Sequence, residues 1–382
     1  MNFSIESKLP NLGITIFTKM SKLAQEHNAI NLSQGFPDFP PDQKLLELVK
    51  QGLDENHNQY APLAGLISLR KTLAEKLFKS YGSRYSAEEE ITITAGATQA
   101  IFTAISAFIR KDDEVIVFKP AYDCYEPAIE LYGGKPILVE MKAPTYKIDW
   151  QEVSAKITSK TKMIVINTPH NPSGTVLEQE DLVQLQQLVE NTNILILSDE
   201  VYEHLIYDDK KHQSVARFPK LAERSLITYS FGKTFHVTGW KVGYCVAPEE
   251  LMKEFRKVHQ YNVFCVNHPM QWALNEYLQK PDHYLELSTF YQEKRDYFLQ
   301  QIKNSRLELI PAQGTYFQTA SYKNITTEKD TDFALRLIKE KGLATIPVSV
   351  FNKDQKDELM LRFCFAKKKE TLAKAAAIIN SL

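Results

Sequence analysis

The sequence contains little cysteine, and none of it has the C-x-x-C spacing. The four cysteines, Cys124, Cys245, Cys265 and Cys364, are scattered, and several lie in apolar runs. Zinc sites and disulfide frameworks depend on close or regular cysteine spacing, so both are disfavoured. We expect free, buried thiols in a reducing compartment, and therefore a cytoplasmic protein without a metal site.

Net charge and long apolar runs are also nearly absent. Lys and Arg number 46 against 47 Asp and Glu, which leaves a formal charge of −1 and no global field for nucleic acid or an anionic membrane. No apolar run approaches the roughly twenty residues of a membrane span. Residues 1–6 lack a basic region followed by an apolar core, so we expect no signal peptide. The basic run Lys367-Lys368-Lys369 is interpreted as a solvated loop or helix start.

Two glycine-rich nucleotide-binding motifs are missing. Gly232-Lys233-Thr234 looks like the end of a P-loop, but that motif needs a glycine five residues before Gly232, where Ile227 stands. No G-x-G-x-x-G follows an early strand, which disfavours a nicotinamide dehydrogenase.

Short, continuously apolar runs are present. They lie at residues 115–118, 163–166, 194–197 and 226–229, and helical patterns such as 178–189 separate several of them. Such runs suit strands buried on both faces of a mainly parallel sheet. We therefore predict an α/β fold with a large doubly wound domain, whose ligands gather beyond the carboxyl ends of the strands. Further along, strands at 315–319 and 359–365 flank a helix at 332–341 and predict a smaller α+β domain.

Lys233 lies between aromatic and small residues in segment 230–244. An ordinary lysine, with a pKa of about 10.4, is no nucleophile at neutral pH. Apolar neighbours such as Phe231 and Phe235, and a second cation such as Lys241, would lower that pKa. The functional interpretation is a Schiff-base lysine that holds an aldehyde cofactor, and the alternative is a solvated lysine on a surface turn.

A phosphate site is predicted at Gly96-Ala97-Thr98, between a strand and a helix. Small residues let the backbone approach a phosphate, and the helix N-terminus supplies free N–H groups. Ser230 and Lys241 would complete the site. Taken alone, the segment also fits an ordinary strand-to-helix turn.

Asp199 follows the strand at 194–198 and could hold a protonated pyridine nitrogen. Tyr202 would donate to the phenolate oxygen of the same ring. A helix N-cap is the alternative for Asp199. The side chain of Glu200 is expected to point elsewhere.

Two loops complete the set. Segment 167–174 holds two X-Pro bonds close together, which predicts a rigid loop that allows cis peptides and presents the Asn171 amide to a ligand. Tyr122 would stack on a flat ring, with simple packing as its alternative. A phosphate site, a stacking ring, an amide, a carboxylate, a phenol and an amine on successive strand ends match one cofactor, pyridoxal 5'-phosphate.

Along nearly its whole length the sequence resembles the fold-type I pyridoxal-phosphate-dependent aminotransferases of class I/II. Segments 31–40, 167–174 and 230–244 are most similar to bacterial methionine aminotransferases and kynurenine/glutamine aminotransferases. The resemblance implies an aspartate aminotransferase-like fold, with an N-terminal arm and part of the small domain at 1–45, a large cofactor-binding domain at 46–284 and a small domain at 285–382. It also implies transfer of the amino group of methionine, or of an aromatic or glutamine-like amino acid, to a 2-oxo acid in two half-reactions.

The resemblance also implies a role for each site residue. Lys233 would be the Schiff-base lysine and proton shuttle, Asp199 the partner of the pyridine nitrogen, and Asn171 and Tyr202 the partners of the ring oxygen. Tyr122 would stack on the ring, and the phosphate would be bound at Gly96, Ala97, Thr98, Ser230 and Lys241. Lys241 stands where many family members carry arginine.

Three further residues have roles only through the resemblance. Arg362 would hold the substrate α-carboxylate, which suits its bidentate fork, although by itself it would be interpreted as a strand-edge charge. Gly35 would lie close to the substrate. Tyr60 would reach the phosphate of the partner subunit, which implies a homodimer with shared active sites.

Two alternatives to an aminotransferase stay open. A carbon–sulfur β-lyase acting on cysteine conjugates uses the same α-proton loss. A transcription regulator with an aminotransferase-like domain needs a DNA-binding segment before Ile30, and the arm there is short and not basic. The apolar residues Ile14, Ile16, Phe17 and 261–264 favour a methionine or aromatic side chain on the substrate.

Overall fold

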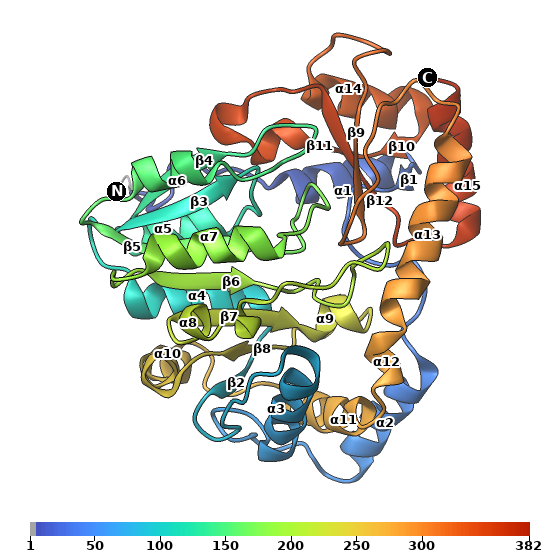
Figure 1. Cartoon of the computed structure of the whole chain (residues 1–382). Helices are drawn as coiled ribbons and strands as arrows, with labels where there is room; N and C mark the ends of the chain where they lie inside the picture. The colour runs from blue at the N-terminus through green and yellow to red at the C-terminus, as the bar shows by residue number, and fades with distance from the viewer. Residues whose placement is uncertain (1–4) are drawn as a thin grey trace, which may run out of the picture.

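The computed structural model describes residues 5–382, so the first four residues of the predicted N-terminal arm lie outside the description. Its centre is a seven-stranded sheet with the order β2-β8-β7-β6-β5-β3-β4 (Figure 1). The strands are β2 (Ile91–Thr94), β3 (Glu114–Lys119), β4 (Lys135–Glu140), β5 (Thr161–Asn167), β6 (Leu195–Asp199), β7 (Ser225–Ser230) and β8 (Gly243–Val246). β8 is antiparallel to both of its neighbours and the other pairs are parallel, so the predicted mainly parallel sheet is confirmed.

Successive residues of the buried strands belong to two separate cores. In β3, Val115 and Val117 pack on one face of the sheet, and Ile116 and Phe118 pack on the other. Helices α4 (Ala97–Phe108), α5 (Tyr125–Leu131) and α10 (Glu249–Asn262) cover the first face, and α6 (Trp150–Lys156) and α7 (Gln179–Val189) contribute to the second core. Successive side chains of a strand point to opposite faces of the sheet. Because helices cover both faces here, residues on either face of such a strand are buried, which explains the continuously apolar runs.

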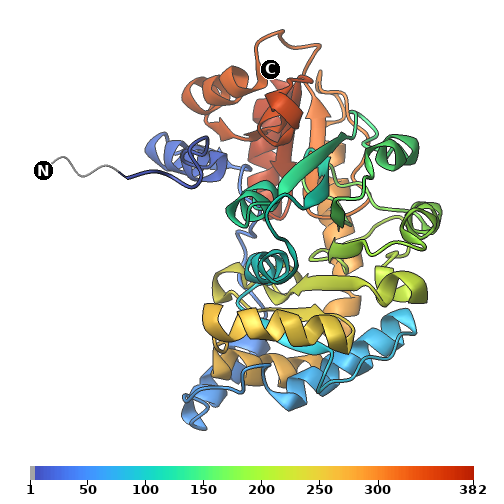
Figure 2. The ribbon, with the colours of Figure 1, turned by 90° about the vertical axis from the view of Figure 1, so that its left-hand side faces the viewer.

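A second, smaller sheet has the order β11-β12-β9 and is antiparallel. Its strands are β9 (Phe317–Ser321), β11 (Ile346–Pro347) and β12 (Met360–Cys364), accompanied by α13 (Leu287–Ile302), α14 (Asp330–Arg336) and α15 (Lys369–Asn380). The N-terminal α1 (Ile16–Glu26) lies beside these C-terminal elements (Figure 2), and β1 (Ile30–Asn31) pairs with β10 (Leu343–Ala344). The α/β fold class with a small α+β part is confirmed, and the exact domain boundaries stay a prediction.

The remaining helices are α2 (Gln43–Asp54), α3 (Ile67–Tyr81), α8 (Pro219–Ala222), α9 (Phe231–Thr234), α11 (His268–Leu278) and α12 (Asp282–Leu285). The apolar pattern does not indicate β4, whose edge position leaves several residues half-exposed, or β8, which follows a glycine-rich segment. The helix predicted at 332–341 instead starts at Asp330, and its last five residues form a π-helical turn.

The interpretation of the basic run Lys367-Lys368-Lys369 as solvated is wrong for Lys367. Lys367 is only 2% exposed, and its Nζ donates to the carbonyl of Phe36 at 2.8 Å. Lys369 does begin α15, as a helix start predicts. Lys367, the first residue of the basic run, therefore connects the start of the C-terminal helix to the proline-rich loop at 31–41 by a hydrogen bond.

All four cysteines are free, and Cys265 is only half-buried. Between residues 5 and 382, no helix is long and apolar enough to cross a membrane. The same residues include no group of three or more His, Cys, Asp or Glu side chains suited to a metal ion.

Candidate active site

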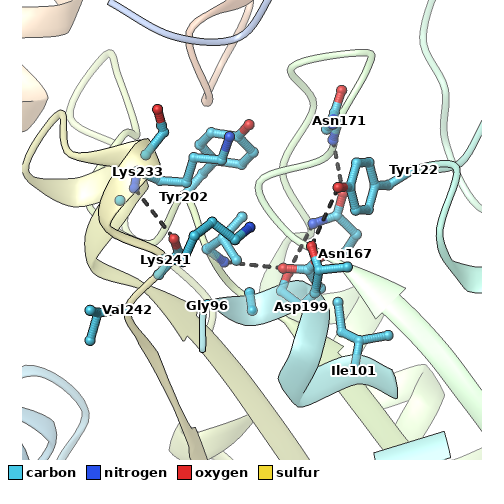
Figure 3. A pocket seen from close by; sticks show the side chains of 16 residues that line it. Gly96, Ile101, Tyr122, Asn167, Asn171, Asp199, Tyr202, Lys233, Lys241 and Val242 are labelled. Carbon is cyan, nitrogen blue, oxygen red and sulfur yellow. Dashed lines mark hydrogen bonds between the residues drawn. The ribbon is translucent and has the colours of Figure 1, made fainter. Parts of the chain in front are cut away.

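A cavity lies beyond the carboxyl ends of β5, β6 and β7, where the sheet pattern predicts a ligand (Figure 3). The predicted site residues that line it are Gly96, Ala97, Thr98, Tyr122, Asn171, Asp199, Tyr202, Ser230, Lys233 and Lys241. These residues come from distant parts of the sequence and meet because parallel strands end at the same edge of the sheet.

Lys233 lies in the short helix α9, directly after β7. The Ser230 side chain caps this helix, because its Oγ accepts from the backbone N–H of Lys233 at 3.4 Å. Burial, helped by the nearby cations Lys241 and Arg362, lowers the pKa of Lys233 to about 8, although the acidic groups Cys364 and Asp199 act in the opposite direction. The amine is therefore far closer to neutral at physiological pH than an ordinary lysine.

Asp199 ends β6 and is 4% exposed. The Tyr125 hydroxyl donates to its Oδ2 at 2.6 Å, and the backbone N–H of Val201 donates to Oδ1 at 3.3 Å. Burial raises the pKa of Asp199 to about 6 although both bonds lower it. Turns rather than a helix follow Asp199, so the N-cap alternative is wrong. A buried carboxyl of this kind fits a cationic partner such as a protonated ring nitrogen.

The predicted orientation of Glu200 is confirmed. Its carboxylate points away from the cavity and accepts from Ser198 Oγ at 2.8 Å, from His212 Nε2 at 2.8 Å and from the backbone N–H of Val215 at 3.1 Å. Asp199 is therefore the acid that faces the ligand.

Asn167, which the sequence prediction leaves out of the site, organises the loop after β5. Its Oδ1 accepts from the backbone N–H of Asn171 at 2.9 Å, and its Nδ2 donates to the carbonyl of Asp199 at 2.9 Å. Both X-Pro bonds of the loop, Thr168-Pro169 and Asn171-Pro172, are cis. Asn167 thereby joins the loop that carries Asn171 to the strand end that carries Asp199.

Arg362 lies on β12, the middle strand of the small sheet, and is fully buried, so its interpretation as a strand-edge charge is wrong. Its Nη1 donates to Asn171 Oδ1 at 2.8 Å and its Nη2 to the carbonyl of Ser33 at 2.9 Å. Its Nε has no hydrogen-bond partner among residues 5–382. A buried guanidinium with an unused donor fits an anionic ligand group.

Gly35 lies against the same aromatic side chain as Arg362. The Arg362 guanidinium is 3.9 Å from the centre of the Phe317 ring, and a Cβ on Gly35 would be 2.5 Å from Phe317 Cζ. The Tyr316 hydroxyl donates to the Gly35 carbonyl at 2.5 Å. Neither Gly35 nor Arg362 lines the cavity itself, but Arg362 reaches it through Asn171.

Free backbone N–H groups, a lysine side chain and a hydroxyl lie together at the N-terminus of α4. Gly96 caps this helix with a φ of 79° and without a side-chain bond to the first N–H groups, which stay available to a ligand. A Cβ on Gly96 would be 3.6 Å from Lys241 Nζ, so the ammonium lies beside the helix end. The Thr98 hydroxyl, 3.4 Å from the Tyr122 hydroxyl, lies at the same end of the cavity. This donor set suits a phosphate group.

Like Gly35 and Arg362, the predicted site residue Tyr60 does not line the cavity. It is 81% exposed and packs edge-on against Phe264, with ring centres 5.2 Å apart.

A phosphate site, a buried carboxyl with a raised pKa and an amine with a lowered pKa together fit pyridoxal phosphate. The comparisons with known proteins agree. The aminotransferase class I and II family matches residues 27–379. The chain is 48% identical to the methionine aminotransferase of Escherichia coli, over 99% of this chain and 98% of that protein, and 35% identical to mouse kynurenine–oxoglutarate transaminase 1, over 93% and 92%.

Solved structures show the same likeness. The structure of Escherichia coli YbdL, described as having a methionine aminotransferase function, superposes with a TM-score of 0.96 at 47% identity over the full length of both chains. Thermus thermophilus aspartate aminotransferase with maleate reaches a TM-score of 0.91 at 28% identity, over 99% of each chain. These relatives are transaminases, which does not favour the β-lyase alternative. The chain therefore belongs to the class I and II aminotransferases, enzymes that depend on pyridoxal phosphate.

Proposed function

We propose that this aminotransferase takes methionine, or another amino acid with an apolar or aromatic side chain, as its amino donor and a 2-oxo acid as its acceptor. The observation that carries the proposal is the Lys233 amine, whose pKa burial lowers to about 8, in one cavity with Asp199 and Tyr202. The relatives named for methionine and kynurenine support the class of donor. A panel of amino acids against several 2-oxo acids tests it, and a preference for aspartate or another acidic donor would contradict it.

The roles proposed for the individual residues follow from their chemistry. The backbone and side chains of Gly96, Ala97, Thr98, Ser230 and Lys241 would bind the phosphate, Tyr122 would stack on the ring, Asp199 would pair with its nitrogen, and Asn171 and Tyr202 would donate to its oxygen. Bound pyridoxal phosphate supplies an aldehyde that joins an amine covalently and a ring that accepts electrons when the α-proton leaves.

Lys233 then acts as general base and acid. A neutral Nζ accepts the α-proton of the amino acid, and the resulting ammonium returns a proton in the next step. Lys241 and Arg362 favour the neutral form of this amine, because each adds positive charge nearby. The cavity around Lys233 thus keeps one amine ready for proton transfer near physiological pH.

The pKa of Lys233 predicts how cofactor uptake depends on pH. The amine must be neutral to attack an aldehyde, and its neutral fraction rises with pH through about 8. The rate at which apoenzyme recombines with pyridoxal phosphate should therefore increase between pH 6.5 and 8.5 and level off above that range. Stopped-flow absorbance on apoenzyme measures this rate, and a rate that still rises steeply at pH 10 would indicate an ordinary lysine.

Arg362 is proposed to hold the substrate α-carboxylate through a neighbouring N–H and its Nε, which has no partner in the part of the chain that the structure describes. Arg362→Lys keeps the charge but removes the fork, so the KM for the amino acid should rise roughly 10- to 100-fold, the equivalent of one charged hydrogen bond. The affinity for pyridoxal phosphate should change little. Steady-state kinetics and a cofactor titration separate the two effects, and a KM like that of the wild type would refute the assignment.

Apolar side chains surround this proposed carboxylate site. The Phe17 and Phe351 rings are 5.7 Å apart, and their centres lie 5.4 Å and 5.6 Å from the Arg362 guanidinium. A side chain in place of Gly35 would clash with the Phe317 ring, so this position has room only for glycine. An apolar wall next to a carboxylate clamp supports a methionine or aromatic donor over a charged one.

A homodimer with shared active sites is also part of the proposal, with Tyr60 reaching the phosphate of the partner subunit. Tyr60 and Tyr261 are 81% and 87% exposed, and Phe264 packs against Tyr60. The exposed aromatic pair of Tyr60 and Phe264 favours a protein interface. Sedimentation velocity in a buffer of physiological pH and ionic strength should show a dimer. A monomer with full activity would contradict the shared site.

A further inference from the structure

His170 is buried between two of the loops that form the site, and the proposed reaction gives it no role. It is 6% exposed. Its Nε2 is 2.9 Å from the carbonyl of Pro120, in the loop that leads to Tyr122. Its Nδ1 is 2.6 Å from Ser173 Oγ, within the loop that carries Asn171. One imidazole therefore bridges both loops without lining the cavity.

The partners of His170 determine its tautomer. A carbonyl can only accept, so Nε2 must carry the hydrogen that bonds to Pro120. In the neutral ring Nδ1 is then an acceptor, and the Ser173 hydroxyl must donate to it. Burial lowers the pKa of His170 to about 4, opposed by the bond to Pro120, so the ring is neutral at physiological pH.

The chain of hydrogen bonds continues beyond Ser173 in one direction. Because the Ser173 hydroxyl donates its hydrogen to His170, its oxygen accepts from Thr175, whose hydroxyl is 2.7 Å away and whose backbone N–H is 3.2 Å away. The backbone of the same loop also bonds to itself, from the N–H of His170 to the carbonyl of Thr175 and from the N–H of Gly174 to the carbonyl of His170, both at 2.8 Å. The result is a chain of hydrogen bonds, called the relay below, that runs from Thr175 through Ser173 and His170 to the carbonyl of Pro120. Each donor in it has one acceptor.

The two loops that this relay joins carry side chains on the same side of the cavity. Tyr122 and Asn171 lie opposite Lys233 (Figure 3). Asn171 Oδ1 also accepts from Arg362, so a displaced Asn171 would disturb the guanidinium as well. We propose that His170 is a positioning residue, whose directed hydrogen bonds hold the Tyr122 loop and the Asn171 loop at a fixed separation around the cofactor ring. This inference rests on the proposed roles of Tyr122 and Asn171.

His170→Phe tests the relay, because it keeps an aromatic ring of similar size but removes both nitrogens. We expect kcat/KM to fall on the order of tenfold to a hundredfold, as for small misplacements around a reacting centre. The absorbance maximum of the bound cofactor should shift, because ring stacking and the bond to the ring oxygen change. His170→Gln retains an amide N–H for Pro120 and should restore most of the loss. Wild-type kinetics and spectrum in the folded His170→Phe variant would overturn the proposal.

Coupling within the relay gives a second, independent measurement. Ser173→Ala removes the donor to Nδ1, and if the relay acts as a unit, Ser173→Ala combined with His170→Phe should be no worse than His170→Phe alone. Fully additive losses would contradict the relay. If His170→Phe fails to fold, Ser173→Ala and His170→Gln still decide, since wild-type kcat/KM and cofactor spectrum in Ser173→Ala would refute the proposal.

His283→Phe is a matched control. The His283 Nδ1 also bonds to a backbone carbonyl, that of Tyr277 at 2.7 Å, but it lies outside the cavity lining. This variant should leave the cofactor spectrum and kcat/KM unchanged even if it lowers stability. Borohydride labelling of Lys233 in the wild type and in each variant tests the proposed function separately from the inference on His170. A labelled Lys233 with unchanged kinetics in His170→Phe refutes only the inference on His170, whereas an unlabelled Lys233 in the wild type refutes the proposed function.

Discussion

Lys233→Ala is expected to lower kcat for transamination on the order of 10⁴-fold while the protein stays folded. Lys233 supplies both the amine that joins the cofactor and the base that moves the α-proton, and among residues 5–382 Lys241 is the only other lysine that lines the cavity. Lys241 lies beside the helix N-terminus at the phosphate end, so it is poorly placed to substitute. Burial of a charged amine costs stability, so its removal should not unfold the protein.

The control for this variant is Lys294→Ala. Burial also lowers the pKa of Lys294, whose Nζ lies over the Phe39 and Phe290 rings, but this lysine is outside the cavity lining. Its removal should leave kcat close to that of the wild type. Single-turnover absorbance of the bound cofactor, with circular dichroism as the check on folding, measures both variants. Substantial turnover in Lys233→Ala would rule out the proposed mechanism.

Asp199→Asn should lower kcat/KM by about 10²- to 10³-fold, the typical effect of removing one preorganised charge partner. In the protein alone, burial raises the pKa of Asp199 to about 6. A protonated ring nitrogen beside it would favour the carboxylate, and the carboxylate would in turn keep that nitrogen protonated. Asparagine has the same shape but no charge, so it cannot do this.

The pH dependence of cofactor binding gives an independent check on Asp199. As the pH falls through about 6, the free enzyme becomes protonated at Asp199 and loses the charge that attracts the ring. Affinity for pyridoxal phosphate should therefore decrease at acid pH in the wild type and depend much less on pH in Asp199→Asn. Equal pH dependence in both proteins would show that another group is responsible.

Much of the site could be predicted from the sequence because parallel strands end at one edge of a sheet. Lys233, Asp199 and Asn171 each follow a short apolar run, so their proximity follows from the topology. The role of Arg362 follows only from the resemblance, since the pairing of β12 between β9 and β11 brings together residues far apart in sequence. Its burial could not be inferred from local pattern.

The residues that sequence reasoning missed act through loop geometry. Tyr125 donates to Asp199 across 74 residues, and Asn167 bonds to the Asp199 carbonyl across 32. The only local signal for Tyr125 is its position three residues after Tyr122, on the first turn of α5. Likewise, nothing in the run Lys367-Lys368-Lys369 indicates that Lys367 is bonded to the carbonyl of Phe36.

The covalent role of Lys233 is the central claim, and chemical trapping tests it most directly. Borohydride reduction of the holoenzyme makes the bond between a lysine amine and the cofactor aldehyde permanent, and peptide mass spectrometry then locates the modified residue. We expect a single modified peptide, spanning segment 230–244 and carrying the cofactor on Lys233. Modification of Lys241 or of any other lysine in place of Lys233 would contradict the account.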